Sequence, residues 1–137
     1  MPQDASRIEP TAAVLDGVRR WLTPVREALG PGFLAAYVTG SALTHGFDPK
    51  RSHVNLLVVA RSLEPDVLDR IAAVLPDARR TPRVDPMFMT RDQVAASIDV
   101  FPIEWLDLLE RHLLVEGEDV VAGLEVPRTF LRLQCEH

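Results

Sequence analysis

The sequence predicts an α/β fold in which helices flank a mixed β-sheet. Two apolar runs, FLAAYVT at 33–39 and HVNLLVVA at 53–60, have the length and composition of buried strands. Between and around them lie segments whose apolar residues recur at helical spacing. The 137 residues show no linker and no internal repeat, so we expect a single domain over 1–137.

Residues 11–29 are predicted to form an amphipathic helix. Thr11 is a suitable residue to cap its start, and Gly30 suits its end. Pro24 lies inside the pattern, so we expect a kink or a break there. Residues 1–10, which precede this helix, are polar and are expected to be flexible. The apolar face of the helix consists of Val14, Val18, Trp21, Val25 and Leu29.

The next elements are bounded by glycine and proline. A short helical turn is expected after Gly40, between the two apolar strands. The unbroken apolar run at 56–59 predicts that the second strand is buried on both faces. Pro65 is predicted to begin a helix that Pro76 ends. A third strand is expected at 86–89.

The remaining elements have shorter signals. Residues 90–93, TRDQ, fit a capping box at the start of a short helix. Residues 103–109 fit either a strand or a helix, because the period is ambiguous over so short a run. A short strand is expected at 113–115, and a helix is expected from about residue 127 that is still running at residue 137. More chain, a protein partner or a second copy would have to cover its apolar side chains.

Composition disfavours several classes of protein. The net charge of −5 and the pI of about 5.3 disfavour non-specific nucleic-acid binding. A single cysteine, Cys135, excludes an intramolecular disulfide and a cysteine-rich zinc site. No apolar run has the length of a membrane span, and the first residues lack the apolar core of a signal peptide. We therefore expect a cytoplasmic protein.

The stretch from Tyr37 to Val59 carries the strongest functional signal. A buried strand leads into Gly40-Ser41, and a second strand begins directly behind Ser52. Glycine allows a close approach of the backbone, and a helical turn that begins at Ser41 offers free N–H groups to an anion. A Gly-Ser pair alone is weak evidence, but the loop and the apolar strand that follow make it more specific.

This stretch resembles the active-site signature of the DNA polymerase β-like nucleotidyltransferase superfamily. The resemblance implies a nucleotidyltransferase-like sheet and a nucleotide-binding role for Gly40, Ser41 and Ser52. In that family two carboxylates, one residue apart on the second strand, hold Mg²⁺, and a later strand supplies a third. Residues 101–126 further resemble an uncharacterised branch of the superfamily with degenerate metal-binding residues.

The sequence departs from the family pattern at the positions of the metal-binding carboxylates. His53 and Asn55 stand where the paired carboxylates are expected. Imidazole is a poor Mg²⁺ ligand, and an amide supplies one neutral oxygen in place of an anion. We expect no bound metal and a loss of two-metal catalysis on the order of 10³-fold or more. Asp107, within the apolar-acid-apolar run 106–108, is the candidate third carboxylate.

Three functions are compatible with these residues. The first is a catalytically inactive pseudoenzyme that binds a nucleotide or a protein partner. The second is an active nucleotidyltransferase that modifies a small molecule or a protein, with Mg²⁺ displaced to Asp107, Glu104 or Asp48. The third is a protein-interaction module that docks, or forms a homodimer, through its last helix. The retained glycine-serine turn beside the replaced carboxylates favours the first.

Overall fold

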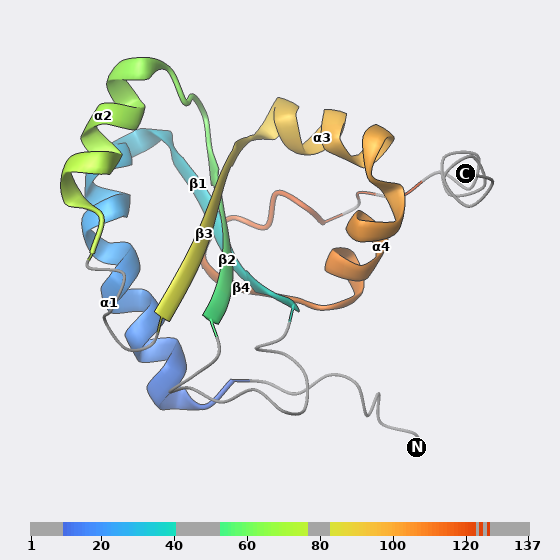
Figure 1. Cartoon of the computed structure of the whole chain (residues 1–137), viewed down its shortest axis with the longest axis horizontal. Coiled ribbons are helices and arrows are strands. Elements are labelled where there is room, and N and C mark those ends of the chain that lie inside the picture. The colour runs from blue at the N-terminus through green and yellow to red at the C-terminus, as the bar shows by residue number, and fades with distance from the viewer. Residues whose placement is uncertain (1–9, 41–52, 77–82, 123, 125, 127–137) are drawn as a thin grey trace.

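The structure is a computed structural model that describes residues 10–40, 53–76, 83–122, 124 and 126. Figure 1 shows a β-sheet between two helical layers, with α1 and α2 on one side and α3 and α4 on the other. The predicted mixed sheet flanked by helices is therefore confirmed. In chain order the elements are α1 (Ala12–Leu29), the 3-10 turn η1 (Gly30–Gly32), β1 (Phe33–Thr39), β2 (His53–Ala60), α2 (Pro65–Val74), β3 (Arg83–Thr90), α3 (Arg91–Val100), α4 (Pro102–Glu110) and β4 (His112–Gly117).

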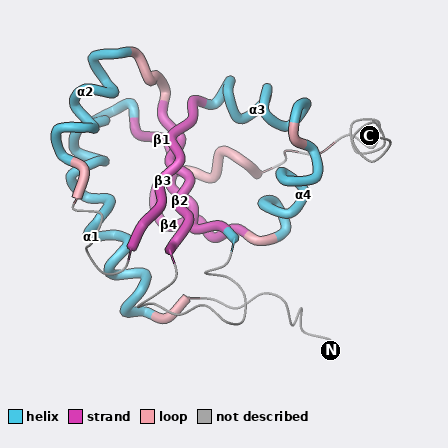
Figure 2. The backbone as a smooth tube through the Cα atoms, in the orientation of Figure 1, coloured by secondary structure: helices cyan, strands magenta, loops and turns pink. Residues whose placement is uncertain are grey.

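The four strands lie in the order β3-β2-β1-β4. Figure 2 shows them in magenta between the cyan helices of the two layers. β1 is antiparallel to both of its neighbours, β2 and β4, whereas β2 and β3 are parallel and are joined through α2. β2 is a central strand, and its residues 56–59 are each at most 1% exposed. Burial on both faces of this strand confirms what the unbroken apolar run predicted.

The sheet separates two hydrophobic cores, because successive side chains of a strand point to opposite faces. Beneath α1 and α2 the buried side chains are Val14, Val18, Trp21, Leu22, Val25, Leu29, Ala36, Val38, Val54, Leu56, Val58, Ala60 and Ile71. On the side of α3 and α4 they are Ala35, Tyr37, Leu57, Val59, Val94, Ile98, Trp105 and Val121. Each helical layer thus buries its own face of one sheet.

The first helix begins as predicted but does not break at Pro24. The Thr11 hydroxyl accepts a hydrogen bond of 3.3 Å from the Val14 N–H, and α1 then runs without interruption to Leu29. Proline removes one backbone hydrogen bond from a helix interior. Trp21 and Val25, on either side of Pro24, are buried against the sheet. We attribute the continuity of the helix to this packing, which outweighs the missing bond.

The short run at 103–109 belongs to a helix, α4, which Pro102 begins. The capping box before α3 is confirmed. The Gln93 N–H donates to the Thr90 hydroxyl at 3.1 Å, and the Thr90 N–H donates to the Gln93 side chain at 2.9 Å. The two helices are tied together where the Trp105 Nε1–H donates to the Ser97 hydroxyl at 2.8 Å. This bond satisfies the polar atom of a side chain that is otherwise buried.

Tyr37, in the middle of β1, anchors the chain that follows β4. Its hydroxyl donates to Asp119 at 2.8 Å and accepts from the N–H of Val120 at 2.7 Å and of Val121 at 3.3 Å. The ring is fully buried and meets the His112 ring edge-on, with 5.6 Å between centroids. One hydroxyl thus holds the backbone of residues 119–121 against the sheet.

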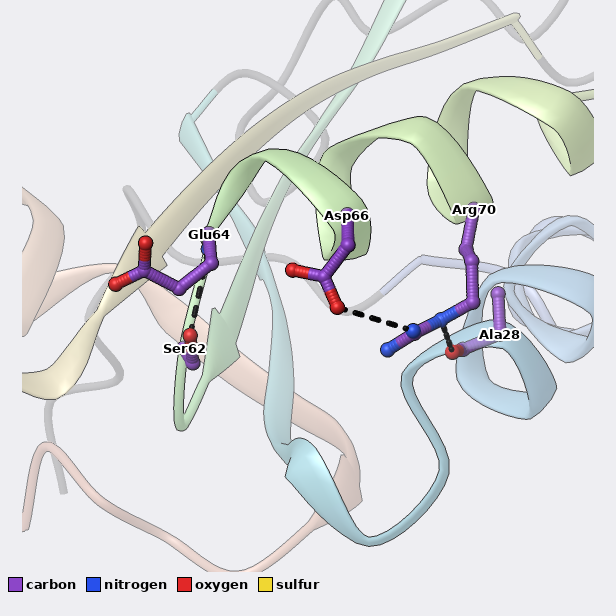
Figure 3. A network of polar contacts seen from close by, with 5 residues as sticks. All are labelled: Ala28, Ser62, Glu64, Asp66 and Arg70. Atoms are coloured by element: carbon purple, nitrogen blue, oxygen red, sulfur yellow. Dashed lines mark hydrogen bonds and ion pairs between the residues drawn. The ribbon is translucent and has the colours of Figure 1, made fainter.

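A second polar network joins α1 and α2, the two helices that cover the opposite face of the sheet (Figure 3). The Arg70 Nε–H donates to the carbonyl of Ala28 at 3.3 Å, which links α2 to the last turn of α1. Arg70 also pairs with Asp66 one turn earlier, at 3.4 Å. The Glu64 N–H donates to the Ser62 hydroxyl at 3.3 Å just before α2 begins. These side chains are exposed, so we expect each pair to contribute well under about 1 kcal/mol.

Some predicted features lie outside the described residues. These are the flexibility expected of residues 1–9, the helical turn expected after Gly40 and the helix expected from about residue 127. Among the helices that the structure describes, none combines the length and the apolar character needed to cross a bilayer.

Candidate functional site

A row of polar side chains crosses one end of the sheet. Asn55 of β2 is in register with Thr39 of β1 and with Asp85 of β3. Thr39 is in turn opposite His112 of β4. The row therefore runs Asp85, Asn55, Thr39, His112 across all four strands, with neighbours roughly 5 Å apart.

This row faces the layer of α3 and α4. The residues two positions further along, Tyr37 and Leu57, belong to the core on that side, and side chains two apart share a face. Asn55 is half-buried, and Asp85 is exposed. This face of the sheet is thus apolar beneath α3 and α4. It becomes polar and meets solvent where β1 ends and where β2 and β3 begin.

The row opens into a pocket of about 270 Å³. Among the described residues, neither the Asn55 amide nor the Asp85 carboxylate has a hydrogen-bond partner within the protein. Both are therefore available to a bound molecule. The pocket is lined by Thr39, Asn55, Leu56, Leu57, Asp85, Pro86 and Met87.

The backbone of Gly40 lies close to the Asn55 side chain. Its φ of +70° lies in the left-handed region, which glycine adopts without strain. A Cβ at this position would lie 3.0 Å from Asn55 Nδ2, closer than ordinary van der Waals contact. The glycine therefore allows the backbone to turn directly over the Asn55 amide.

One step further out, the strands carry a histidine and an arginine. His53 and Arg83 are in register on β2 and β3, and both are exposed. Alternation places them on the same face as Asn55 and Asp85. Among the described residues Arg83 has no ion-pair partner. This end of the two strands therefore carries the cation of Arg83 near the single carboxylate of Asp85.

The residues present do not fit Mg²⁺. A magnesium site requires near-octahedral oxygen ligands and usually two or more carboxylates. His53, Asn55 and Asp85 together offer one anion, one amide oxygen and an imidazole. Across the part of the chain that the structure describes, no group of three histidine, cysteine, aspartate or glutamate side chains is placed to hold a metal.

Asp107 does not lie on a strand, which corrects its assignment as a strand-borne third carboxylate. It is on α4, it is exposed, and its carboxylate pairs with Arg111 one turn later at 2.6 Å. It does not line the pocket of Asn55 and Asp85. Glu104, from the same helix, lines a different pocket. Ser41, Ser52 and Asp48 lie outside the described residues, and their roles stay predictions.

Asp85 is the site residue that sequence analysis missed. The expected third strand began at Pro86, whereas β3 begins at Arg83 and includes the proline. β3 is an edge strand, where a proline can turn its missing N–H away from the ladder. The run Val84-Asp85-Pro86 has the apolar-acid-apolar form that was sought at 106–108. Extending the strand by three residues would have revealed this signal.

Comparison with known proteins relates the fold to that of an enzyme of known structure. No protein-family model matches the chain, and no curated protein matches it. Among solved structures, the chain is similar to spectinomycin adenyltransferase AAD(9) from Enterococcus faecialis, whose crystal structure contains ATP and spectinomycin. The two share 14% sequence identity with a TM-score of 0.58, over 90% of this chain and 63% of the enzyme. This chain thus spans less than two thirds of that enzyme's length, and the likeness shows a nucleotidyltransferase-like fold.

Proposed function

We propose that this nucleotidyltransferase-like protein binds a nucleotide without a metal ion and does not transfer it. The observation that carries the proposal is the in-register row in which a neutral amide, Asn55, lies between Thr39 and Asp85. A lone carboxylate beside an amide holds a divalent cation poorly. The same groups form hydrogen bonds well, since the amide both donates and accepts and the carboxylate accepts.

The charges at this end of the sheet support the proposal. Phosphates carry negative charge that a bound Mg²⁺ would neutralise in an active enzyme of this kind. Here Arg83 and His53 lie in register beside the pocket, and Arg83 offsets the charge of Asp85. The Arg83 guanidinium thus takes the place of the metal as the positive charge beside the phosphates.

The proposal is tested by titrating ATP into the protein by calorimetry, once in EDTA and once in Mg²⁺. We expect binding in EDTA with an affinity at least equal to that in Mg²⁺. Arg83→Gln is expected to weaken binding about tenfold, because it removes a charge-assisted hydrogen bond. Arg61→Gln is the matched control, since Arg61 is an exposed arginine at the opposite end of β2.

Two results would contradict the proposal. Binding that requires Mg²⁺, together with transfer of labelled nucleotide to an acceptor, would indicate an active nucleotidyltransferase. The absence of ATP binding under both conditions, at millimolar ligand, would leave a protein-interaction module as the better explanation.

Restoring carboxylates should create a metal site. Without metal, we expect the double variant His53→Asp, Asn55→Asp to melt at a lower temperature than the wild type. Its two new carboxylates and that of Asp85 would be three like charges close together. Mg²⁺ or Mn²⁺ should raise its melting temperature by mass action and leave the wild type unchanged. Adding Asp85→Asn to the double variant is the control, and it should abolish the metal response. A response that survives this third change would show that Asp85 does not converge with positions 53 and 55.

A further inference from the structure

Four side chains on one face of β3 differ in chemical character from one end of the strand to the other. Arg83, Asp85, Met87 and Met89 occupy alternate positions and so share one face of the strand. At roughly 3.3 Å per residue they extend over about 20 Å. From the first to the last, the strand offers a cation, a hydrogen-bond acceptor and two thioethers. This order corresponds to the phosphate, ribose and base of a nucleotide.

An apolar pocket of about 250 Å³ lies at the methionine end of this face, between β3 and the corner where α3 meets α4. Met87 lines this pocket and also the polar pocket of Asn55 and Asp85, so the two pockets are neighbours along β3. The apolar pocket is lined by Met87, Met89, Ser97, Phe101, Glu104, Trp105 and Leu108.

The apolar pocket is lined by one buried, hydrogen-bonded aromatic side chain and by two large apolar side chains that are exposed. Trp105 is 4% exposed and is held by its hydrogen bond to Ser97, so its ring is a preformed surface. Phe101 and Met87 are 52% and 48% exposed, which is high for large apolar side chains. A planar ring between them would remove this apolar surface from water. Aromatic and thioether groups also make favourable contacts with a π-system.

We infer that the base of the nucleotide binds in this apolar pocket, with the ribose at Asn55 and Asp85 and the phosphates at Arg83 and His53. The inference rests on the proposed nucleotide binding and adds the direction of the ligand along β3. A carboxylate that does not hold a metal accepts hydrogen bonds from the ribose hydroxyls. The Ser97 hydroxyl, whose oxygen accepts from Trp105, keeps its own hydrogen for a ring nitrogen.

The test compares ATP with inorganic triphosphate, both in EDTA, by calorimetry. We expect wild type to bind ATP at least about tenfold more tightly than triphosphate, since base stacking contributes on this order. Phe101→Ala and, separately, Met87→Ala should remove most of this difference and leave the triphosphate affinity unchanged. Leu68→Ala, at an exposed apolar residue of α2 in the other helical layer, is the matched control and should change neither affinity.

The outcomes separate this inference from the proposed function. Equal affinities for ATP and triphosphate in the wild type would overturn the base pocket while leaving nucleotide binding intact. So would an ATP preference that survives both substitutions, provided that each variant melts as the wild type does. If neither ATP nor triphosphate binds, the proposed function fails, and the inference fails with it.

Discussion

Replacing Gly117 with alanine is expected to lower the free energy of unfolding by more than about 3 kcal/mol. Gly117 ends β4 opposite Ala35 and has a φ of +92°. A Cβ there would lie 2.2 Å from the Leu34 carbonyl oxygen and 2.8 Å from the Ala35 Cα. Both of these are backbone atoms of β1, so relief of the clash requires that β4 move away from its partner strand.

Urea unfolding followed by far-UV circular dichroism measures this effect. Gly32→Ala is the control, because its added Cβ would meet no atom within 4 Å and its φ is not positive. We expect that control to be neutral or slightly stabilising, since alanine restricts the unfolded chain more than glycine does. Equal midpoints for the two variants would show that β4 is not held against β1 at this register.

Replacing Tyr37 with phenylalanine is expected to destabilise the fold by about 2 to 4 kcal/mol. The change removes one hydroxyl, which leaves the N–H of Val120 without its acceptor and takes one donor from the Asp119 carboxylate. Unmade hydrogen bonds in a buried site cost more than the net value of the bonds themselves. The control is Thr23→Val, which removes an exposed hydroxyl that bonds only its own helix. A loss for Tyr37→Phe no larger than the control's would contradict this assignment.

The same hydroxyl gives the protein a dependence on alkaline pH. Burial, with a further contribution from its hydrogen bond to Asp119, raises the pKa of Tyr37 from an ordinary 10.0 to about 12. Between these two values the folded protein keeps a proton that the unfolded chain has lost. The stabilisation is therefore complete below pH 10 and is lost as the pH rises toward 12. Tyr37 is the only tyrosine in the sequence, so near-UV absorbance of the tyrosinate follows it directly.

The comparison with Tyr37→Phe isolates this effect from the titration of other groups. Between pH 10 and 12 the stability of the wild type should fall more steeply than that of the variant. Parallel slopes, or ionisation of the folded protein at the ordinary value, would show that the hydroxyl is not buried as described.

The central strands were the most predictable part of the fold. β1 and β2 begin and end at the residues that the apolar runs indicated, because an unbroken run of this kind is stable only inside a sheet. The cap at Thr11 and the box at 90–93 were also predicted, since both depend on neighbouring residues alone. The break considered at Pro24 is absent, because the continuity of the helix depends on packing against distant strands, which no local pattern contains.

The site was harder to predict because its residues meet through strand register. Asn55 and Asp85 belong to strands that are separated in the sequence by the whole of α2. The alternation of side chains within β2 does not indicate which residue of β3 pairs with Asn55. The positions of His53 and Asn55 on one face of β2 follow from their spacing, and their role stays a prediction. Asp107 was predicted to be the third carboxylate because three residues of the form apolar-acid-apolar fit a strand and a helix equally well.

The pairing of β1 with β4 has a consequence for the order in which the protein is made. The first strand to leave the ribosome keeps one hydrogen-bonding edge open until residues 112–117 emerge, and Tyr37 has no acceptor until residue 119 follows. We therefore expect nascent chains that stall before this point to stay sensitive to proteases and to associate with chaperones. Release of a few more residues should end both together, so that the newly synthesised chain becomes resistant only after residue 119 has emerged.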